Sequence, residues 1–134
     1  MDNRFLFFSA EAMSPASKYL MDAIYPVEQR FNEVYESKYK NDELESIAII
    51  FICTNQSMQE SGFYPERNYI SHKNKYADMR MIIPYNDFLK ADEKLKKQMI
   101  WDVIKRALDN IRRKRAYKRI DELEDDIYSV FWLG

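Results

Sequence analysis

Segment 46–54, which reads Ser-Ile-Ala-Ile-Ile-Phe-Ile-Cys-Thr, constrains the fold of this chain more than any other feature. Its side chains are apolar on both alternating faces and rich in β-branched residues, so it predicts a strand. A strand with one wet face would instead alternate apolar and polar residues. We therefore expect a central strand covered on both sides, and the rest of the chain must supply that cover.

The lone cysteine, Cys53, lies inside this segment, and the lone histidine, His72, follows it along the chain. A single cysteine cannot form an internal disulfide, and a free thiol in an apolar segment usually packs as a small buried hydrophobe. A buried thiol argues against a cysteine–histidine nucleophile pair. The two residues also lack the clustered spacing of a structural zinc site.

Two long helices flank the central strand in the sequence. Ser14 and Pro15 are typical of a helix start, and Pro26 should kink or split the helix that follows. Its apolar stripe comprises Leu20, Ile24, Val27, Phe31 and Val34. Polar residues 36–45 then read as a connection. Asp92 is a plausible N-cap for a second helix over residues 92–115. Its apolar stripe comprises Leu95, Met99, Ile100, Val103, Ile104, Ala107, Leu108 and Ile111.

Three further segments predict strands, namely residues 4–9, 67–72 and 76–85. The last two are separated by a turn over residues 71–75. Alternating polar and apolar residues in segment 76–85 are typical of an antiparallel strand with one wetter face. We therefore predict an α+β fold in which an antiparallel sheet of about four strands is packed by two long helices. Residues 1–134 would form one domain, ending in an acidic and then aromatic tail over residues 118–134. The apolar end of this tail, residues 130–133, would either fold back onto the core or form an exposed contact patch.

Composition and charge exclude several classes of protein. The 134 residues are 46% hydrophobic and 15% aromatic, which is too rich in core formers for a disordered chain. The start of the chain, with Asp2 and only a short apolar stretch, does not read as a signal peptide. The longest apolar run is too short to span a bilayer. We therefore expect a cytoplasmic protein without a membrane segment.

Charge is unevenly distributed along the chain. Residues 1–66 carry 5 Lys and Arg against 11 Asp and Glu, whereas residues 67–134 carry 16 against 11, and the total is −1. A near-neutral total argues against a dedicated nucleic-acid binder, which is normally basic. One alternative stays open, a small nucleic-acid-binding or regulatory module, because the basic run at residues 105–119 could contact phosphates. It could equally be a solvated helix end neutralised by the acidic tail.

The sequence holds no motif that points to catalysis. Its two glycines, Gly62 and Gly134, cannot build a phosphate-binding loop, and no recognisable carboxylate pair is present. We expect no enzyme activity, no catalytic residue, no metal and no cofactor.

Exposed acids and one tryptophan are the candidate binding residues. Either the acids solvate helix faces, or they steer a cationic partner while buried aromatics supply affinity. Trp101 lies off the centre of its helix stripe, where it could flank the core or contact a partner. The acids are Glu28, Glu33 and Glu36 in the first helix and Asp121, Glu122, Glu124, Asp125 and Asp126 in the tail.

Three segments carry a resemblance to a known family: Tyr64-Pro65-Glu66-Arg67, residues 70–80 and residues 83–92. They resemble the immunity proteins of bacterial polymorphic toxin and contact-dependent growth inhibition systems, and most of all immunity protein family forty-four. The resemblance covers about half the chain. The chain departs from the family pattern at His72, where a basic residue is expected, and at Pro84, where an acid is expected.

The resemblance implies a protein that binds the C-terminal domain of a cognate toxin, often a nuclease, in a one-to-one complex that blocks the active site. Partner-specific recognition needs a shared scaffold with variable contact surfaces. We therefore expect toxin contacts from the acids and Trp101 named above. The family motif would instead form an ion network that fixes strand register, through Glu66, Arg67, Lys73, Lys75, Asp78 and Arg80.

Overall fold

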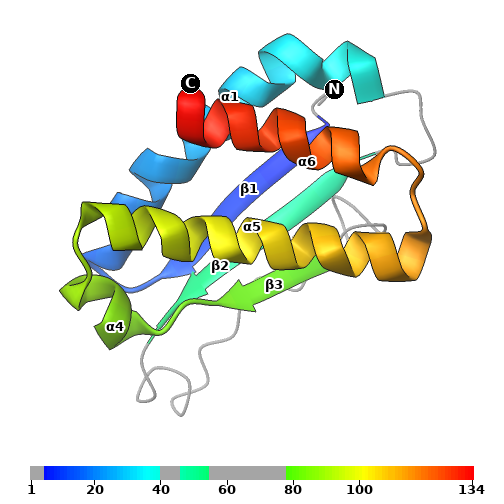
Figure 1. The fold of residues 1–134 in the computed structure, drawn as a ribbon. Coiled ribbons are helices and arrows are strands. Elements are labelled where there is room, and N and C mark those ends of the chain that lie inside the picture. Colours follow the sequence, from blue (N-terminus) through cyan, green and yellow to red (C-terminus); the bar gives the residue numbers. More distant parts are fainter. Residues whose placement is uncertain (1–4, 40–45, 55–77) are drawn as a thin grey trace.

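The computed structural model describes residues 5–39, 46–54 and 78–134 and shows helices layered on a small sheet (Figure 1). The strands are β1 (Leu6–Ala12), β2 (Ile47–Cys53) and β3 (Asp78–Ile82). The helices are α1 (Ala16–Tyr39), α4 (Tyr85–Lys90), α5 (Glu93–Arg115), α6 (Ile120–Tyr128) and a closing π-helical turn, η1 (Ser129–Leu133).

The sheet is parallel, so the prediction of an antiparallel sheet with about four strands is wrong. In the described residues three strands run in the order β1-β2-β3, and both neighbouring pairs are parallel. For β1 and β2 the physical reason lies in α1, which returns the chain from the end of β1 to the start of β2. A helical crossover of this kind joins parallel neighbours, whereas a tight hairpin joins antiparallel ones. The predicted strand at residues 67–72 lies outside the described residues.

The prediction of a covered central strand is confirmed. All seven residues of β2 are buried, and β2 lies between β1 and β3. Ile47, Ile49 and Phe51 face the helices and join the main core. Ile50 and Ile52 point to the opposite face, where they form a second, separate buried cluster. Continuous apolar sequence is typical of a parallel strand buried on both faces.

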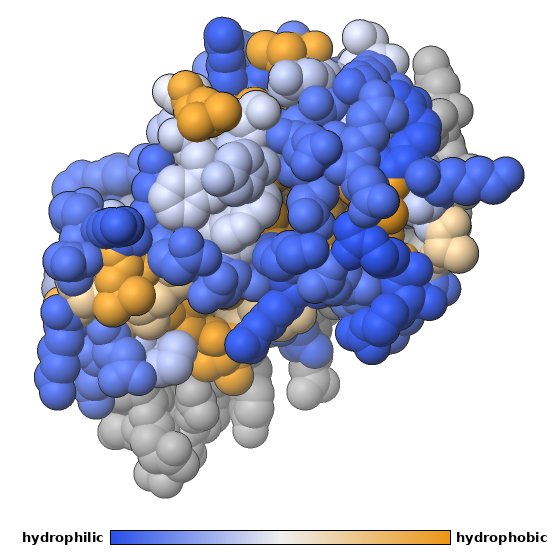
Figure 2. Space-filling model, viewed as in Figure 1, coloured by the Kyte–Doolittle hydropathy of each residue, from blue (hydrophilic) through white to orange (hydrophobic). Residues whose placement is uncertain are grey.

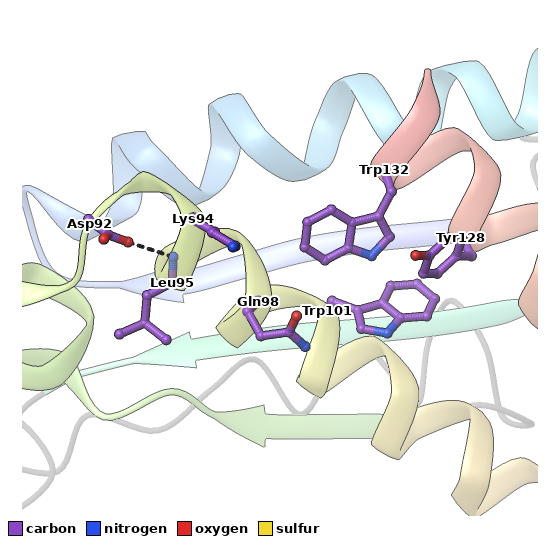
Figure 3. Close-up of a pocket in the computed structure, with 7 residues that line it drawn as sticks. All are labelled: Asp92, Lys94, Leu95, Gln98, Trp101, Tyr128 and Trp132. Carbon is purple, nitrogen blue, oxygen red and sulfur yellow. Dashed lines mark hydrogen bonds between the residues drawn. The ribbon is translucent and has the colours of Figure 1, made fainter.

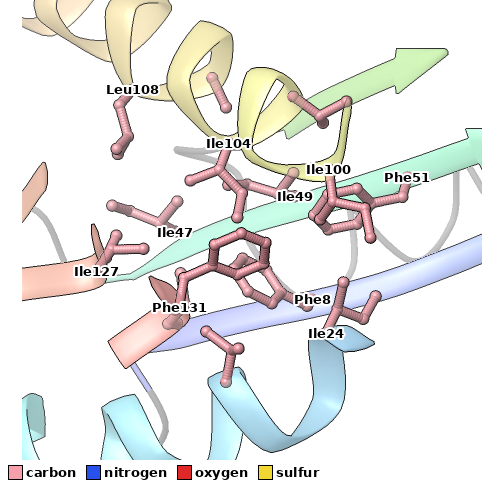
Figure 4. Packing of buried hydrophobic residues seen from close by; sticks show 14 of the residues in the cluster. Phe8, Ile24, Ile47, Ile49, Phe51, Ile100, Ile104, Leu108, Ile127 and Phe131 are labelled. Atoms are coloured by element: carbon pink, nitrogen blue, oxygen red, sulfur yellow. The ribbon is translucent and has the colours of Figure 1, made fainter. Parts of the chain in front are cut away.

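The main core lies between one face of the sheet and helices α1, α5 and α6 (Figure 4). Phe8 of β1 meets Phe51 of β2 edge to face, with ring centroids 5.4 Å apart. Helix α1 buries Leu20, Ile24, Val27 and Phe31 in this core, as its predicted stripe requires, and α5 buries Ile100, Val103, Ile104, Ala107, Leu108 and Ile111. Burial of this apolar area is the main source of stability of the fold.

The outer edge of β1 is covered by polar side chains of α1. Asn32 Oδ1 accepts hydrogen bonds from the backbone N–H groups of Phe5 and Leu6, both at 2.9 Å, and Asn32 Nδ2 donates to Leu6 O at 2.8 Å. Glu28 Oε2 accepts from the N–H of Phe8 at 2.6 Å. Unpaired edge groups would otherwise invite another strand. Two buried polar residues of a helix therefore replace a further strand at this edge.

Several local predictions need correction. Pro26 does not split α1, which continues through it to Tyr39, so residues 36–39 belong to the helix and not to a connection. Val34 and Leu95 are 47% and 51% exposed, so neither belongs to the core stripe of its helix. The N-cap prediction is confirmed, because Asp92 Oδ1 accepts from the N–H of Leu95 at 2.8 Å.

The acidic and aromatic tail packs as an integral part of the core. Ile120, Leu123, Ile127 and Phe131 are buried against the sheet and the other helices, whereas Leu133 is 77% exposed. The apolar end of the chain thus both folds back and presents an exposed side chain. None of the helices in ranges 5–39 and 78–134 combines the length and hydrophobicity that a membrane crossing requires.

Candidate partner-binding surfaces

A cavity of about 530 Å³ opens between α5 and the C-terminal helical segment (Figure 3). Three of its lining residues are large aromatic side chains, and they come from α5, α6 and η1. The lining residues are Asp92, Lys94, Leu95, Gln98, Trp101, Tyr128 and Trp132. We call this cavity the aromatic groove.

The aromatic side chains of the groove pack against one another. Trp101 meets Tyr128 edge to face at 5.2 Å and stacks on Phe131 at 5.8 Å, measured between ring centroids. Tyr128 lies 6.2 Å from Trp132. Such contacts hold the rings in defined positions, and rigid aromatic surface is the type of surface that anchors protein partners. Trp101 is 9% exposed, so it both flanks the core and lines the groove.

A second cavity, of about 480 Å³, lies on the other side of Trp132. Lys97 sits between the two cavities, with its ammonium 5.1 Å from the Trp132 ring centroid and 5.4 Å from that of Phe131. Residues of α1 and of the chain end complete its lining, namely Pro26, Val27, Arg30, Val130, Leu133 and Gly134. In Figure 2 a pale and orange patch marks this region, surrounded by hydrophilic surface.

Four of the five predicted acids of the tail are paired with cations of neighbouring helices. Glu122 and Asp126 contact Lys38 of α1 at 2.8 and 2.7 Å. On the α5 side, Glu124 contacts Lys105 at 3.0 Å and Arg112 at 3.3 Å, and Asp121 contacts Arg112 at 2.8 Å. Asp125 is exposed and has no ion pair within the described residues. These pairs fasten α6 to both long helices.

The pKa values reflect this pairing. Hydrogen bonds from Arg119 and Lys38 lower the pKa of the Glu122 carboxyl to about 2. Burial, and then the hydrogen bond that the Tyr39 hydroxyl donates to Asp126, raise the pKa of Tyr39. The hydrogen bond from Lys38 to Asp126 raises the pKa of that lysine. All of these groups therefore hold their ordinary charge state around neutrality.

The three predicted acids of α1 lie near a cavity of about 440 Å³, but they differ in exposure. Glu28 is buried and accepts the Phe8 N–H, so its carboxylate is occupied by the fold. Glu33 is exposed and accepts a hydrogen bond from Gln29 at 3.2 Å, and Glu36 is half-buried. Glu33 is thus the most accessible carboxylate of the three.

The basic run at residues 105–119 is partly neutralised within the fold. Lys105 and Arg112 pair with acids of α6, and Arg119 pairs with Glu122 at 3.1 Å. Arg106, Arg113, Lys114 and Lys118 are exposed, and Arg113 contacts the amide of Asn110. The sequence allowed either phosphate contact or neutralisation by the acidic tail. For Lys105, Arg112 and Arg119 the structure shows neutralisation.

Cys53 is buried, as predicted, and burial raises the pKa of its thiol to about 11. Within the described ranges no group of three His, Cys, Asp or Glu side chains could hold a metal ion. His72 and the motif residues Glu66, Arg67, Lys73 and Lys75 lie outside those ranges. Asp78 and Arg80 lie two apart on β3, opposite Ala48 and Ile50 of β2, and Arg80 is exposed.

The sequence indicated Trp101 and the apolar end of the chain as possible contacts, but not that Trp101, Tyr128 and Trp132 line one groove. Tyr128 and Trp132 lie four residues apart, which places them on one face of a helix. That spacing was the available signal. Leu95 was assigned to the core because it fits the helical period, although it opens onto the groove.

The comparison with known families covers nearly the whole fold just described. A family model described as Immunity protein 44 matches residues 5–131. No curated protein and no solved structure matches the chain. The matched range runs from the start of β1 to Phe131 beneath the aromatic groove, and it confirms the resemblance first seen in residues 64–92. The chain belongs to the immunity protein 44 family.

Proposed function

We propose that this protein binds the C-terminal domain of a cognate toxin in a one-to-one complex and neutralises it by occluding its active site. Membership of an immunity protein family supports a toxin as the partner. The observation that carries the binding role is the aromatic groove. It exposes Tyr128 and Leu95, at 45% and 51%, beside Trp132 in one cavity. Aromatic anchors in a pocket dominate the affinity of protein interfaces.

The experiment is co-expression with the toxin domain encoded directly upstream, followed by calorimetric titration of the separately purified proteins. We expect a stoichiometry of one and a dissociation constant in the nanomolar range or below, as is usual for small cognate inhibitors. The same titration should abolish toxicity and activity in parallel. Absence of binding between a folded protein and an active toxin domain would refute the proposal.

We further propose that the toxin is a nuclease. Exposed carboxylates support this, because nucleases carry cationic surfaces for their substrates, and complementary charge speeds association. Of the acids expected at the interface, Glu33, Asp121, Glu122 and Asp125 are exposed, although Asp121 and Glu122 are paired with cations of the fold. The others are buried or half-buried.

The nuclease proposal is tested by incubating the toxin domain with plasmid DNA and with total RNA, with and without an equimolar amount of the immunity protein. We expect cleavage of one substrate and its loss on addition. Charge reversal at Glu33 and Asp125 should slow association several-fold at low salt, whereas reversal at Asp22, an exposed acid paired with Lys18, should not. A toxin that cleaves neither substrate would refute this proposal.

A further inference from the structure

We propose that the aromatic groove and the cavity behind Trp132 form one docking site for a segment of the toxin that carries a large apolar side chain beside a carboxylate. This inference rests on the proposed function and deepens it, because it names the surface and the chemistry of the contact. It assigns the apolar anchor to the groove and the carboxylate to its cationic rim.

Exposed apolar side chains gather around these two cavities. Of the large hydrophobic residues exposed in the described ranges, Leu95, Tyr128 and Leu133 line these two cavities. Trp132 lines both cavities and is their shared wall. Figure 3 shows its ring and those of Trp101 and Tyr128 gathered from η1, α5 and α6. A groove of about 530 Å³ is large enough to accept an aromatic or long aliphatic side chain.

The rim of the two cavities is positively charged, and this charge determines which residue is favoured beside the apolar anchor of the bound segment. Lys94 lines the groove, Arg30 lines the second cavity, and Lys97 lies between them over Trp132. Lys94 and Arg30 are exposed. Asp92 is the one acid in the lining, and its carboxylate caps the N-terminus of α5. Complementarity therefore favours a carboxylate on the bound segment.

Trp132 adds a second polar feature to the docking site, an indole N–H that needs a hydrogen-bond acceptor. Its indole Nε1 is buried and has no hydrogen-bond partner among the described residues. A buried donor without an acceptor costs free energy. Trp132 lines both cavities, so a carbonyl or carboxylate oxygen of the bound segment that reaches this N–H would remove the cost.

Both tryptophans of the chain line the groove, which gives a direct spectroscopic test. The immunity protein is labelled with 5-fluorotryptophan, and its two ¹⁹F resonances are assigned with the variants Trp101→Phe and Trp132→Phe. Unlabelled toxin domain is then added to one equivalent. We expect both resonances to shift, with the larger shift at Trp132. Unshifted resonances in a complex that calorimetry shows to be saturated would overturn the inference.

Exposed residues provide variants that leave the core intact. Leu95→Glu should raise the dissociation constant about tenfold or more, and Lys94→Glu about threefold. The matched controls are Ile82→Glu, at a side chain that is 57% exposed on β3, and Lys118→Glu in the turn before α6. Both controls should change affinity less than about twofold. Thermal unfolding of each variant verifies that it is folded.

The outcomes distinguish failure of the docking site from failure of the proposed function. Tight wild-type binding that Leu95→Glu and Lys94→Glu leave within twofold would overturn the docking site and leave the proposed function standing. No wild-type binding would refute the proposed function and the docking site with it. Loss of affinity in the groove variants but not in the controls supports both.

Discussion

Asn32 is the residue whose side chain makes the most consequential polar contacts in this fold. It satisfies two backbone donors and one acceptor at the start of β1, where Phe5 and Leu6 are fully buried. A strand at the edge of a sheet has unpaired backbone groups, and here they lie away from water. Side-chain amides can replace a neighbouring strand because they offer a donor and an acceptor together.

We predict that Asn32→Ala lowers the free energy of unfolding by about 3 kcal/mol, because several buried backbone groups would lose their partners. Urea denaturation measures the change. The matched control is Gln29→Ala, one turn earlier on α1, where the exposed side chain bonds only Glu33 and the change should stay below about 0.5 kcal/mol. Equal effects of the two substitutions would contradict the assigned role of Asn32.

Cys53 shows how burial controls reactivity at the scale of one residue. Burial raises the pKa of its thiol from 9.0 to about 11, which lowers the reactive thiolate fraction about 100-fold near neutral pH. We predict that a thiol reagent such as 5,5′-dithiobis(2-nitrobenzoic acid) modifies the native protein at least about 100-fold more slowly than the urea-unfolded chain. Similar rates in both states would show that the thiol is accessible in the fold.

At the scale of elements, helix α6 is fastened to α1 and α5 by charge pairs around an apolar contact. Lys38 bridges two acids one turn apart, Glu122 and Asp126, while Arg112 and Lys105 reach Glu124 from the other side. Beneath these pairs α6 buries Ile120, Leu123 and Ile127. The apolar contact supplies most of the attachment, since partly exposed ion pairs contribute little each. The pairs set the direction in which α6 presents Tyr128 to the groove.

The pH dependence of stability follows from Glu122. Hydrogen bonds from Arg119 and Lys38 lower its folded-state pKa from 4.5 to about 2. A lowered pKa of a carboxyl stabilises the folded state above the unfolded value, and this stabilisation is lost as pH falls. We predict that wild-type stability declines more steeply than that of Glu122→Gln as pH falls from 4.5 towards 2. Chemical denaturation at several pH values measures the two slopes.

The control for this experiment is Asp125→Asn, which removes an exposed acid with no ion pair in the described part of the chain. Its stability should follow the wild-type slope. If Glu122→Gln also followed that slope, the pairing of Glu122 would have no thermodynamic effect in solution.

At the scale of the whole molecule, acids of the tail at residues 121–126 form ion pairs with cations of the basic run at residues 105–119. The acidic tail folds back over α5, and net charge stays at −1. Lys105, Arg112 and Arg119 are paired with acids, which leaves Arg106, Arg113, Lys114 and Lys118 as exposed cations of the run. Phosphate binding requires several accessible cations on one face, because each neutralised phosphate adds to affinity.

We therefore predict that the isolated protein binds neither duplex DNA nor RNA more tightly than about 10⁻⁴ M near 0.15 M salt. Fluorescence anisotropy with labelled oligonucleotides measures this. Binding near 10⁻⁶ M that falls steeply with salt, and that Lys114→Glu weakens, would revive the nucleic-acid alternative.

Local sequence was sufficient to predict the elements whose character depends on their own residues. The apolar segment at β2, the capping residue Asp92 and the periodic stripe of α5 were each predicted and confirmed. Their signals act over a few residues, because hydrogen bonding and burial repeat with the period of the strand or helix. The family, too, was recognised from local motifs. The same local signals failed at Val34 and Leu95, where an apolar residue at the right period is exposed.

Strand direction, the covered edge and the groove were decided only by the tertiary structure. Alternation in segment 76–85 is compatible with either strand direction, and only the pairing of β3 with β2 shows that it runs parallel. The parallel pairing of β1 with β2 follows from how α1 crosses back to β2. Asn32 reads as an ordinary polar helix residue until β1 lies beside it. Trp101 and Trp132 are distant in sequence and line one groove only because α6 folds over α5. The sequence determines local elements through short-range periodicity, whereas contacts between distant segments exist only once the core has formed.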